Sequence, residues 1–134
     1  MLRVLLVDDV MADRELLREA FLHRGAAVTE AAMDGDAYRA LDGDGGPFDL
    51  LVTDINLGAG TTGFDIARAA RLRQPDIPVV YMTAYDIVTG PHVVANSRVV
   101  RKPMKLAEVA DQALDFLAAQ PTGFGPAQAK PLEA

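Results

Sequence analysis

Residues 48–54 of the chain read Phe48-Asp49-Leu50-Leu51-Val52-Thr53-Asp54, a short aliphatic run that ends on a carboxylate. A strand with one face in water alternates between apolar and polar residues, whereas a nearly continuous apolar run indicates a strand buried on both faces. Residues 2–7 and 78–83 have the same character, and the shorter, more polar runs 28–31 and 98–101 suit the two edges of a sheet. The sequence therefore predicts five strands in a parallel sheet that helices cover on both sides.

Between these runs lie segments in which apolar residues recur with helical spacing. The first of these segments ends before Gly25, and the others occupy about 34–41, 62–73 and 105–119. A further segment follows Thr83, but Gly90-Pro91 interrupts it, so we expect only a short helix there. The first and third of these helices would bury apolar stripes composed of Leu16, Leu17, Ala20 and Phe21, and of Phe64, Ile66, Ala67, Ala70 and Leu72. This alternation predicts an α/β fold, a flavodoxin-like doubly wound five-stranded parallel sheet with strand order 2-1-3-4-5 and a shortened helix 4.

A chain of 134 residues has room for one domain and a short appendage. Half of the residues are apolar and 24% are charged, the balance of a globular protein. Residues 120–134 contain three prolines and two glycines, a composition typical of a disordered tail. We therefore expect a domain over residues 1–119 and a tail over residues 120–134.

The charge and the cysteine content exclude several classes of protein. A net charge of −6 argues against nonspecific binding to nucleic acid or to an anionic membrane. The absence of cysteine excludes a disulfide framework, a zinc–cysteine site and a thiol nucleophile. No apolar run approaches the ~20 residues that span a bilayer, and the first run meets Asp8-Asp9 too early for a signal peptide. We expect a cytoplasmic protein without a nucleic-acid or membrane partner.

Polar side chains stand at the carboxyl ends of four predicted strands, which is the edge where open α/β sheets bind ligands. They are Asp8, Asp9, Asp54, Thr83 and Lys102. Each alone has an ordinary explanation, such as a helix start, a loop carboxylate, a cap or a solvated lysine. Together, however, three carboxylates at ~4 Å would repel by about 4 kcal/mol per pair at an effective dielectric of 20. Such a cluster favours the presence of a cation.

Oxygen ligands without cysteine or paired histidines favour a hard ion, Mg²⁺ before Mn²⁺ or Ca²⁺. A metal beside a carboxylate, a hydroxyl and a lysine is suited to a phosphoryl group. The metal and the lysine neutralise the phosphoryl oxygens while a carboxylate attacks phosphorus and forms an acyl phosphate. The predicted edge of the sheet thus has the groups for phosphoryl transfer.

Four motifs of this sequence resemble those of the receiver domains of two-component response regulators, and the extent of the match is similar to the stand-alone chemotaxis type. The motifs are residues 5–9, 47–54, 82–84 and 101–103, and the resemblance covers residues 2 to about 118. Each motif alone is weak, but all four in order at the ends of strands 1, 3, 4 and 5 are highly specific.

The resemblance implies a role for each residue at this edge. Asp54 would be the phosphoacceptor, and Mg²⁺ would be held by Asp9, Asp54 and the backbone carbonyl of Asn56, with Asp8 acting mainly through water. Two further residues, Thr83 and Lys102, would bind the phosphoryl oxygens, and the peptide bond before Pro103 would be cis.

Three departures from the family pattern concern the loop and the conformational readout. The loop 57–63 lacks the usual proline and is one residue longer than the common loop, and the chain between strands 4 and 5 is shorter than usual. Val99 stands where the family has an aromatic switch residue, three residues before the lysine. We therefore expect any readout to use Tyr85, on the loop after Thr83, or Tyr81, within strand 4.

Other chemically distinctive residues have simpler explanations. His23 and His92 are expected to be surface residues rather than phosphorelay histidines. The arginines of the third helix are expected to form a solvated face: Arg68, Arg71 and Arg73.

Three functions remain open. The first is a single-domain response regulator that accepts a phosphoryl group on Asp54 from a sensor histidine kinase or a histidine phosphotransfer protein and contacts an unknown downstream protein. It would catalyse only its own phosphorylation and dephosphorylation, so we do not expect an enzyme. The second, favoured by Val99, is a phosphate sink or phosphorelay intermediate with little conformational output. The third is a flavin-binding protein of the same fold, although Asp8-Asp9 would repel a flavin phosphate.

Overall fold

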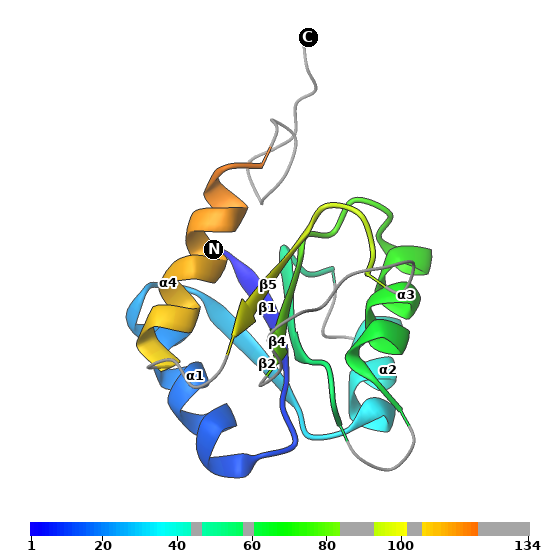
Figure 1. The fold of residues 1–134 in the computed structure, drawn as a ribbon, viewed down its shortest axis with the longest axis horizontal. Helices are drawn as coiled ribbons and strands as arrows, with labels where there is room; N and C mark the ends of the chain where they lie inside the picture. The colour runs from blue at the N-terminus through cyan, green and yellow to red at the C-terminus, as the bar shows by residue number, and fades with distance from the viewer. Residues whose placement is uncertain (44–46, 58–60, 84–92, 102–105, 121–134) are drawn as a thin grey trace, which may run out of the picture.

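The computed structural model describes residues 1–43, 47–57, 61–83, 93–101 and 106–120, which form one five-stranded parallel sheet with helices on both faces (Figure 1). The strands are β1 (Arg3–Val7), β2 (Ala27–Ala31), β3 (Leu50–Asp54), β4 (Val79–Thr83) and β5 (Ser97–Arg101). Their order across the sheet is β2-β1-β3-β4-β5, so the predicted flavodoxin-like order is confirmed.

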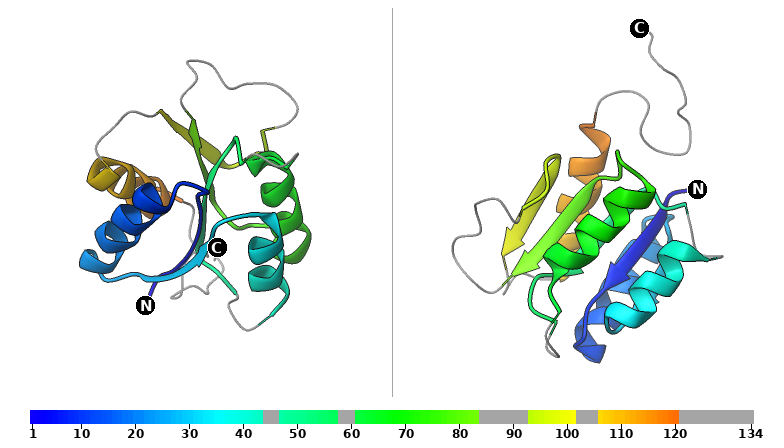
Figure 2. Two further views of the ribbon diagram at one scale, coloured as in Figure 1. Left: turned by 90° about the horizontal axis from the view of Figure 1, so that it is seen from below. Right: turned by 90° about the vertical axis from the view of Figure 1, so that its right-hand side faces the viewer.

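Helices of the described residues cover both faces of the sheet (Figure 2). α1 (Met11–His23) and α4 (Leu106–Ala118) lie on one face, and α2 (Asp34–Asp42) and α3 (Gly63–Arg73) lie on the other. The short helix predicted after Thr83 lies outside the described residues, and the described residues 93–96 before β5 are not helical. The predicted tail also lies outside them from residue 121 onward. Within the described part of the chain, none of the helices has the length and apolar character needed to cross a membrane.

Burial follows the position of each strand in the sheet. β3 and β4 are buried at every residue and β1 at every residue but its first, whereas the edge strands β2 and β5 are partly exposed. Along β1, Val4 and Leu6 pack into the core under α1 and α4, while Leu5 and Val7 pack under α2 and α3. The continuous apolar runs of the sequence are therefore explained by a layer of helices on each face.

Two leucines that the helical spacing placed in the core are exposed. Leu16 on α1 is 59% exposed and Leu72 on α3 is 83% exposed, while their neighbours Leu17 and Ala70 are buried. Successive helical residues lie 100° apart, so Leu16 turns away from the stripe that buries its neighbour Leu17. Leu72 follows Ala70 by two residues, or about 200°, and therefore lies on the opposite side of α3. The predicted stripes were one residue too wide on both helices.

Arg71 on α3 is not part of a solvated face. Its guanidinium is half-buried and donates hydrogen bonds to the carbonyl oxygens of Ile77 (2.7 Å), Ala95 (2.6 Å) and Asn96 (3.0 Å). Burial lowers the pKa of Arg71 from its ordinary value, although the charges near it act in the opposite direction. The side chain connects α3 to the segment that precedes β5.

As predicted, His23 is exposed, and His92 lies outside the described residues.

Candidate functional site

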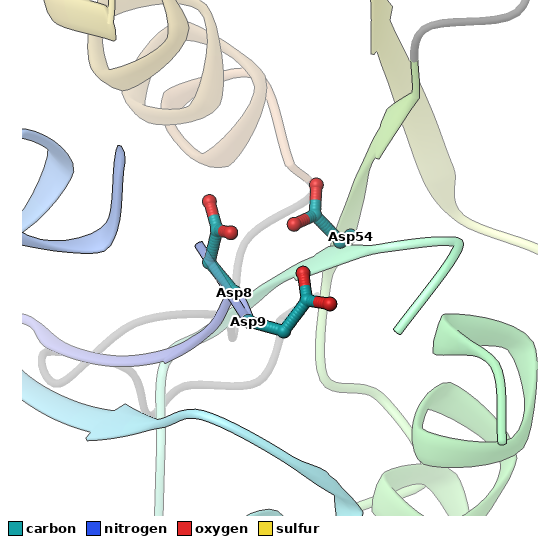
Figure 3. A group of neighbouring side chains, drawn as sticks. All are labelled: Asp8, Asp9 and Asp54. Atoms are coloured by element: carbon teal, nitrogen blue, oxygen red, sulfur yellow. The ribbon is translucent and has the colours of Figure 1, made fainter. Parts of the chain in front are cut away.

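The carboxyl ends of β1 and β3 bring three predicted site residues together. Asp8 and Asp9 follow β1 directly, and Asp54 ends β3, which lies beside β1 with Val7 opposite Thr53. One carboxylate oxygen from each aspartate lies within 4.8 Å of those of the other two, and the three side chains converge on one edge of the sheet (Figure 3). Asp8 and Asp54 are buried, whereas Asp9 is exposed.

Hydrogen bonds from three directions fix the position of Asp8. Its backbone N–H donates to the carbonyl oxygen of Ala31 at the end of β2 (3.1 Å), and its Oδ1 accepts from the backbone N–H of Val10 (2.9 Å). Its carbonyl oxygen accepts a hydrogen bond from Nη1 of Arg14 on α1 (2.9 Å). The sequence did not predict that Arg14 belongs to the site. Its position on α1 is equally compatible with the polar face of the helix and with a contact to Asp8.

The backbone of Asp54 is closely packed on the side of α3. Its carbonyl oxygen accepts a hydrogen bond from the buried hydroxyl of Thr53 (2.9 Å). A Cβ atom built on Gly63 would lie 2.1 Å from this same oxygen, so only a glycine fits at the start of α3. The end of β3 and the start of α3 therefore hold each other in place.

The loop after Asp54 is closed at its base by backbone contacts. The N–H of Gly63 donates to the carbonyl oxygen of Ile55 (2.8 Å), and Asn56 forms an antiparallel bridge with Thr62. Asn56, whose carbonyl is a predicted metal ligand, lies at this base with its side chain exposed. The loop base thus sets the position of both Asp54 and Asn56, while residues 58–60 lie outside the described residues.

A capping box begins α3 immediately after this loop. The Thr62 hydroxyl accepts a hydrogen bond from the backbone N–H of Asp65, and the Asp65 carboxylate accepts one from the backbone N–H of Thr62, both at 3.3 Å. This reciprocal pair satisfies N–H groups that would otherwise lack a partner at the helix start.

Thr83 lies at the same edge, on the strand beside Asp54. It ends β4 and is buried, and Asp54 is in register with Met82, the residue before it. On the other side, Thr83 is in register with Arg101, the residue before Lys102. The structure therefore brings Asp54 and Thr83 to neighbouring strand ends, while the predicted Lys102, the cis peptide at Pro103 and Tyr85 lie outside the described residues.

Tyr81 is a buried member of the core under α2 and α3. Its ring packs on Phe64 of α3 at 5.3 Å between centroids, and its hydroxyl oxygen accepts a hydrogen bond from the backbone N–H of Val94 (3.3 Å). Burial raises the pKa of Tyr81 above its ordinary value of 10.0, and the hydrogen bond from Val94 and the charge of Arg71 partly oppose this shift. Val99 is in register with Tyr81 on β5 and packs against the same core cluster.

The donor set fits a hard divalent cation. Three carboxylates supply only oxygen atoms, and the spacing of these atoms allows one ion to contact more than one of them. Two of the acids are buried, where a cation compensates their charges more strongly than it would in water. The structure thus supports a metal site at this edge from its own chemistry.

Comparisons with known proteins show the family of the chain. The family model described as "Response regulator receiver domain" matches residues 4–114. A similar curated protein is the response regulator protein FleR of Pseudomonas aeruginosa, 37% identical over 91 residues, which are 64% of this chain and 18% of that protein. The chain therefore spans less than a fifth of the length of that relative.

Solved structures show the same fold. A response regulator receiver protein from Sinorhizobium medicae is 25% identical with a TM-score of 0.74, over 88% of this chain and 95% of that one. The chemotaxis response regulator CheY4 of Vibrio cholerae is 24% identical with a TM-score of 0.73, over 87% of this chain and 98% of that one. With the family model matching most of its length, the chain belongs to the response regulator receiver domains of two-component signalling.

Proposed function

We propose that Asp54 accepts a phosphoryl group, in an Mg²⁺-dependent reaction, from a sensor histidine kinase or a histidine phosphotransfer protein. The observation that carries this proposal is the buried Asp54 carboxylate within 4.8 Å of two other carboxylates, at the ligand-binding edge of a receiver domain. The phosphorylated chain would signal through contacts with a downstream protein.

The proposed reaction is a displacement at phosphorus. An oxygen of Asp54 forms a bond to phosphorus, the bond from phosphorus to the donor's imidazole nitrogen breaks, and that nitrogen keeps the electron pair. The product is an acyl phosphate on Asp54. The hydroxyl of Thr83, at the neighbouring strand end, would donate a hydrogen bond to one phosphoryl oxygen, and the ammonium of Lys102 would pair with another.

The residues that would hold Mg²⁺ are Asp9, Asp54 and the carbonyl of Asn56, with Asp8 acting mainly through water. When bound, Mg²⁺ would place positive charge beside the phosphoryl oxygens and so offset their repulsion of the attacking Asp54 carboxylate. The chain would catalyse only its own phosphorylation and dephosphorylation and would convert no other substrate. The chain would act in the cytoplasm, without a nucleic-acid or membrane partner.

Intact-mass spectrometry tests the assignment. With Mg²⁺ and acetyl phosphate, the chain should gain the mass of one phosphoryl group, and Asp54→Asn should gain none. Asp49→Asn is the matched control, because Asp49 stands just before the opposite end of the same strand, where its carboxylate accepts a hydrogen bond from the N–H of Arg3. An adduct that persists in Asp54→Asn would contradict the proposal.

The surroundings of Val99 favour a second candidate, a phosphate sink or phosphorelay intermediate. Val99 has no aromatic ring that could move between a buried and an exposed position. The neighbouring ring of Tyr81 is buried, and its hydroxyl accepts a hydrogen bond from Val94. Pull-downs with chain loaded with beryllofluoride, and with unloaded chain, separate the two candidates. A partner that prefers the loaded form indicates a signalling switch, whereas a short-lived acyl phosphate without such a partner indicates a sink.

A further inference from the structure

Arg14 links the acidic cluster to the edge strand β2. Its Nη1 donates to the carbonyl oxygen of Asp8 (2.9 Å), and its Nε donates to Oε1 of Glu30 on β2 (3.2 Å). The Arg14 side chain is only 16% exposed, and Glu30 is 33% exposed. A guanidinium has several donors in a rigid plane, so contact with Glu30 orients the donor that faces Asp8.

Arg18, one helical turn further along α1, shares the same carboxylate but has other surroundings. Its Nε lies 3.5 Å from Oε2 of Glu30 and its Nη2 lies 3.2 Å from Oε2 of Glu19, and its side chain is 38% exposed. Glu30 therefore lies between two arginines, and Arg14 is the one that reaches the backbone of Asp8. The pair Arg14 and Arg18 offers a matched comparison on one helix.

We propose that Arg14, oriented by Glu30, is a positioning residue that fixes the turn at Asp8-Asp9 and thereby sets the affinity of the acidic cluster for Mg²⁺. This inference rests on the proposed function, because it assumes that the cluster binds the ion. The contact with the Asp8 carbonyl holds the backbone from which both carboxylates project.

The sign of the expected effect separates positioning from simple charge. Removing a positive charge near a cation site strengthens cation binding, because the repulsion between the side chain and the ion disappears. If Arg14 acts by positioning, its removal weakens binding instead. Loss of a group that orients metal ligands from outside typically costs about 10- to 100-fold in metal affinity.

Isothermal titration calorimetry with Mg²⁺ alone tests the inference on the full chain. We expect Arg14→Gln to weaken Mg²⁺ binding by about tenfold or more, and Glu30→Gln to weaken it in the same direction by less. Arg14→Lys, which keeps the charge but has a single ammonium for two acceptors, should lie between Arg14→Gln and the unaltered chain. Arg18→Gln, the control, should leave the affinity unchanged or slightly tighter.

Melting temperatures measured without Mg²⁺ keep the result unambiguous. A lower melting temperature for Arg14→Gln with an unchanged Mg²⁺ affinity would show a purely structural role and overturn the inference. Equal weakening in Arg14→Gln and Arg18→Gln would overturn it as well. If Arg14→Gln fails to fold, Arg14→Lys decides, and its full affinity would contradict the proposal. Absence of Mg²⁺ binding by the unaltered chain would overturn this inference together with the proposed metal site.

Discussion

Tyr81 of β4 lies opposite Val99 of β5 in the register of the two parallel strands. Val99 occupies the position at which receiver domains have an aromatic switch residue, and the ring of Tyr81 lies on the neighbouring strand directly opposite it. Tyr81 is buried against Phe64, and its hydroxyl oxygen accepts a hydrogen bond from Val94 in the segment that enters β5. The aromatic side chain of Tyr81 is thus a buried part of the core.

Tyr81→Phe should lower the free energy of unfolding by about 1 kcal/mol, because the N–H of Val94 loses its acceptor while the ring and its packing remain. Urea unfolding followed by far-UV circular dichroism measures the change. Tyr38→Phe, the same chemical change on a partly buried tyrosine of α2, is the control and should cost less. Equal losses in the two variants would contradict a specific role for the hydrogen bond.

The raised pKa of Tyr81 predicts a loss of stability at high pH. Burial disfavours the ionised phenol, so the unfolded chain releases this proton at a lower pH than the folded chain. The contribution is fully present below the ordinary value of 10.0 and is lost as the pH rises through the raised value. The free energy of unfolding should therefore fall above about pH 10, and less steeply in Tyr81→Phe. Tyrosinate absorption should show a late-titrating component that is absent in Tyr81→Phe.

Gly63→Ala should destabilise the protein, because the added methyl group meets the backbone carbonyl of Asp54, which cannot yield without moving the site. Overpacking of this kind typically costs about 1–3 kcal/mol. Gly35→Ala on α2 is the matched control, since its Cβ would lie 3.6 Å from the end of the Arg39 side chain. Alanine at that helical position should stabilise by about 0.5–1 kcal/mol. Thermal unfolding of both variants measures the contrast, and a neutral Gly63→Ala would contradict the close approach.

Asp9→Asn should stabilise the protein without metal and weaken Mg²⁺ binding, because it removes both a repelling charge and an oxygen ligand. Asp9 is exposed, so water screens the repulsion and the gain is of order 1 kcal/mol. Melting temperatures with and without millimolar Mg²⁺ measure both effects, since an ion that binds the folded state raises the melting temperature. Asp115→Asn, an equal change of charge in the last turn of α4, is the control for Mg²⁺ binding and should leave the Mg²⁺ effect unchanged, although the loss of a negative charge at a helix C-terminus should itself stabilise slightly. An unchanged Mg²⁺ effect in Asp9→Asn would contradict its role as a ligand.

Sequence periodicity predicted the sheet and the acidic cluster well, because both depend on patterns that repeat along the chain. Continuous apolar runs identify strands buried on both faces, and parallel strands end at one edge, so the meeting of Asp8 and Asp54 follows from topology. Periodicity could not separate Leu16 from Leu17, because the choice depends on how α1 is rotated against the sheet.

The contacts of arginine side chains were also beyond sequence reasoning. Arg14 and Arg71 occupy positions on the polar faces of their helices, yet each donates hydrogen bonds to backbone carbonyls of another segment. A long side chain can reach either solvent or a neighbouring loop from the same position, and only the path of that loop decides between them. The path of the loop is a tertiary property that helical spacing does not contain.

The closed base of the loop after Asp54 gives this domain room for variation in loop length. The bond from Gly63 to Ile55 and the bridge between Asn56 and Thr62 join the two ends of the loop before its tip is reached. Residues added between Leu57 and Thr61 would lengthen the tip while the base continues to hold Asp54, and doubling the length of a loop costs only about 0.6 kcal/mol in closure entropy. The longer loop predicted from the sequence is thus compatible with an unchanged position of Asp54. The segment between Leu57 and Thr61 is therefore a suitable site for inserting a short epitope or a fluorophore-binding peptide close to Asp54.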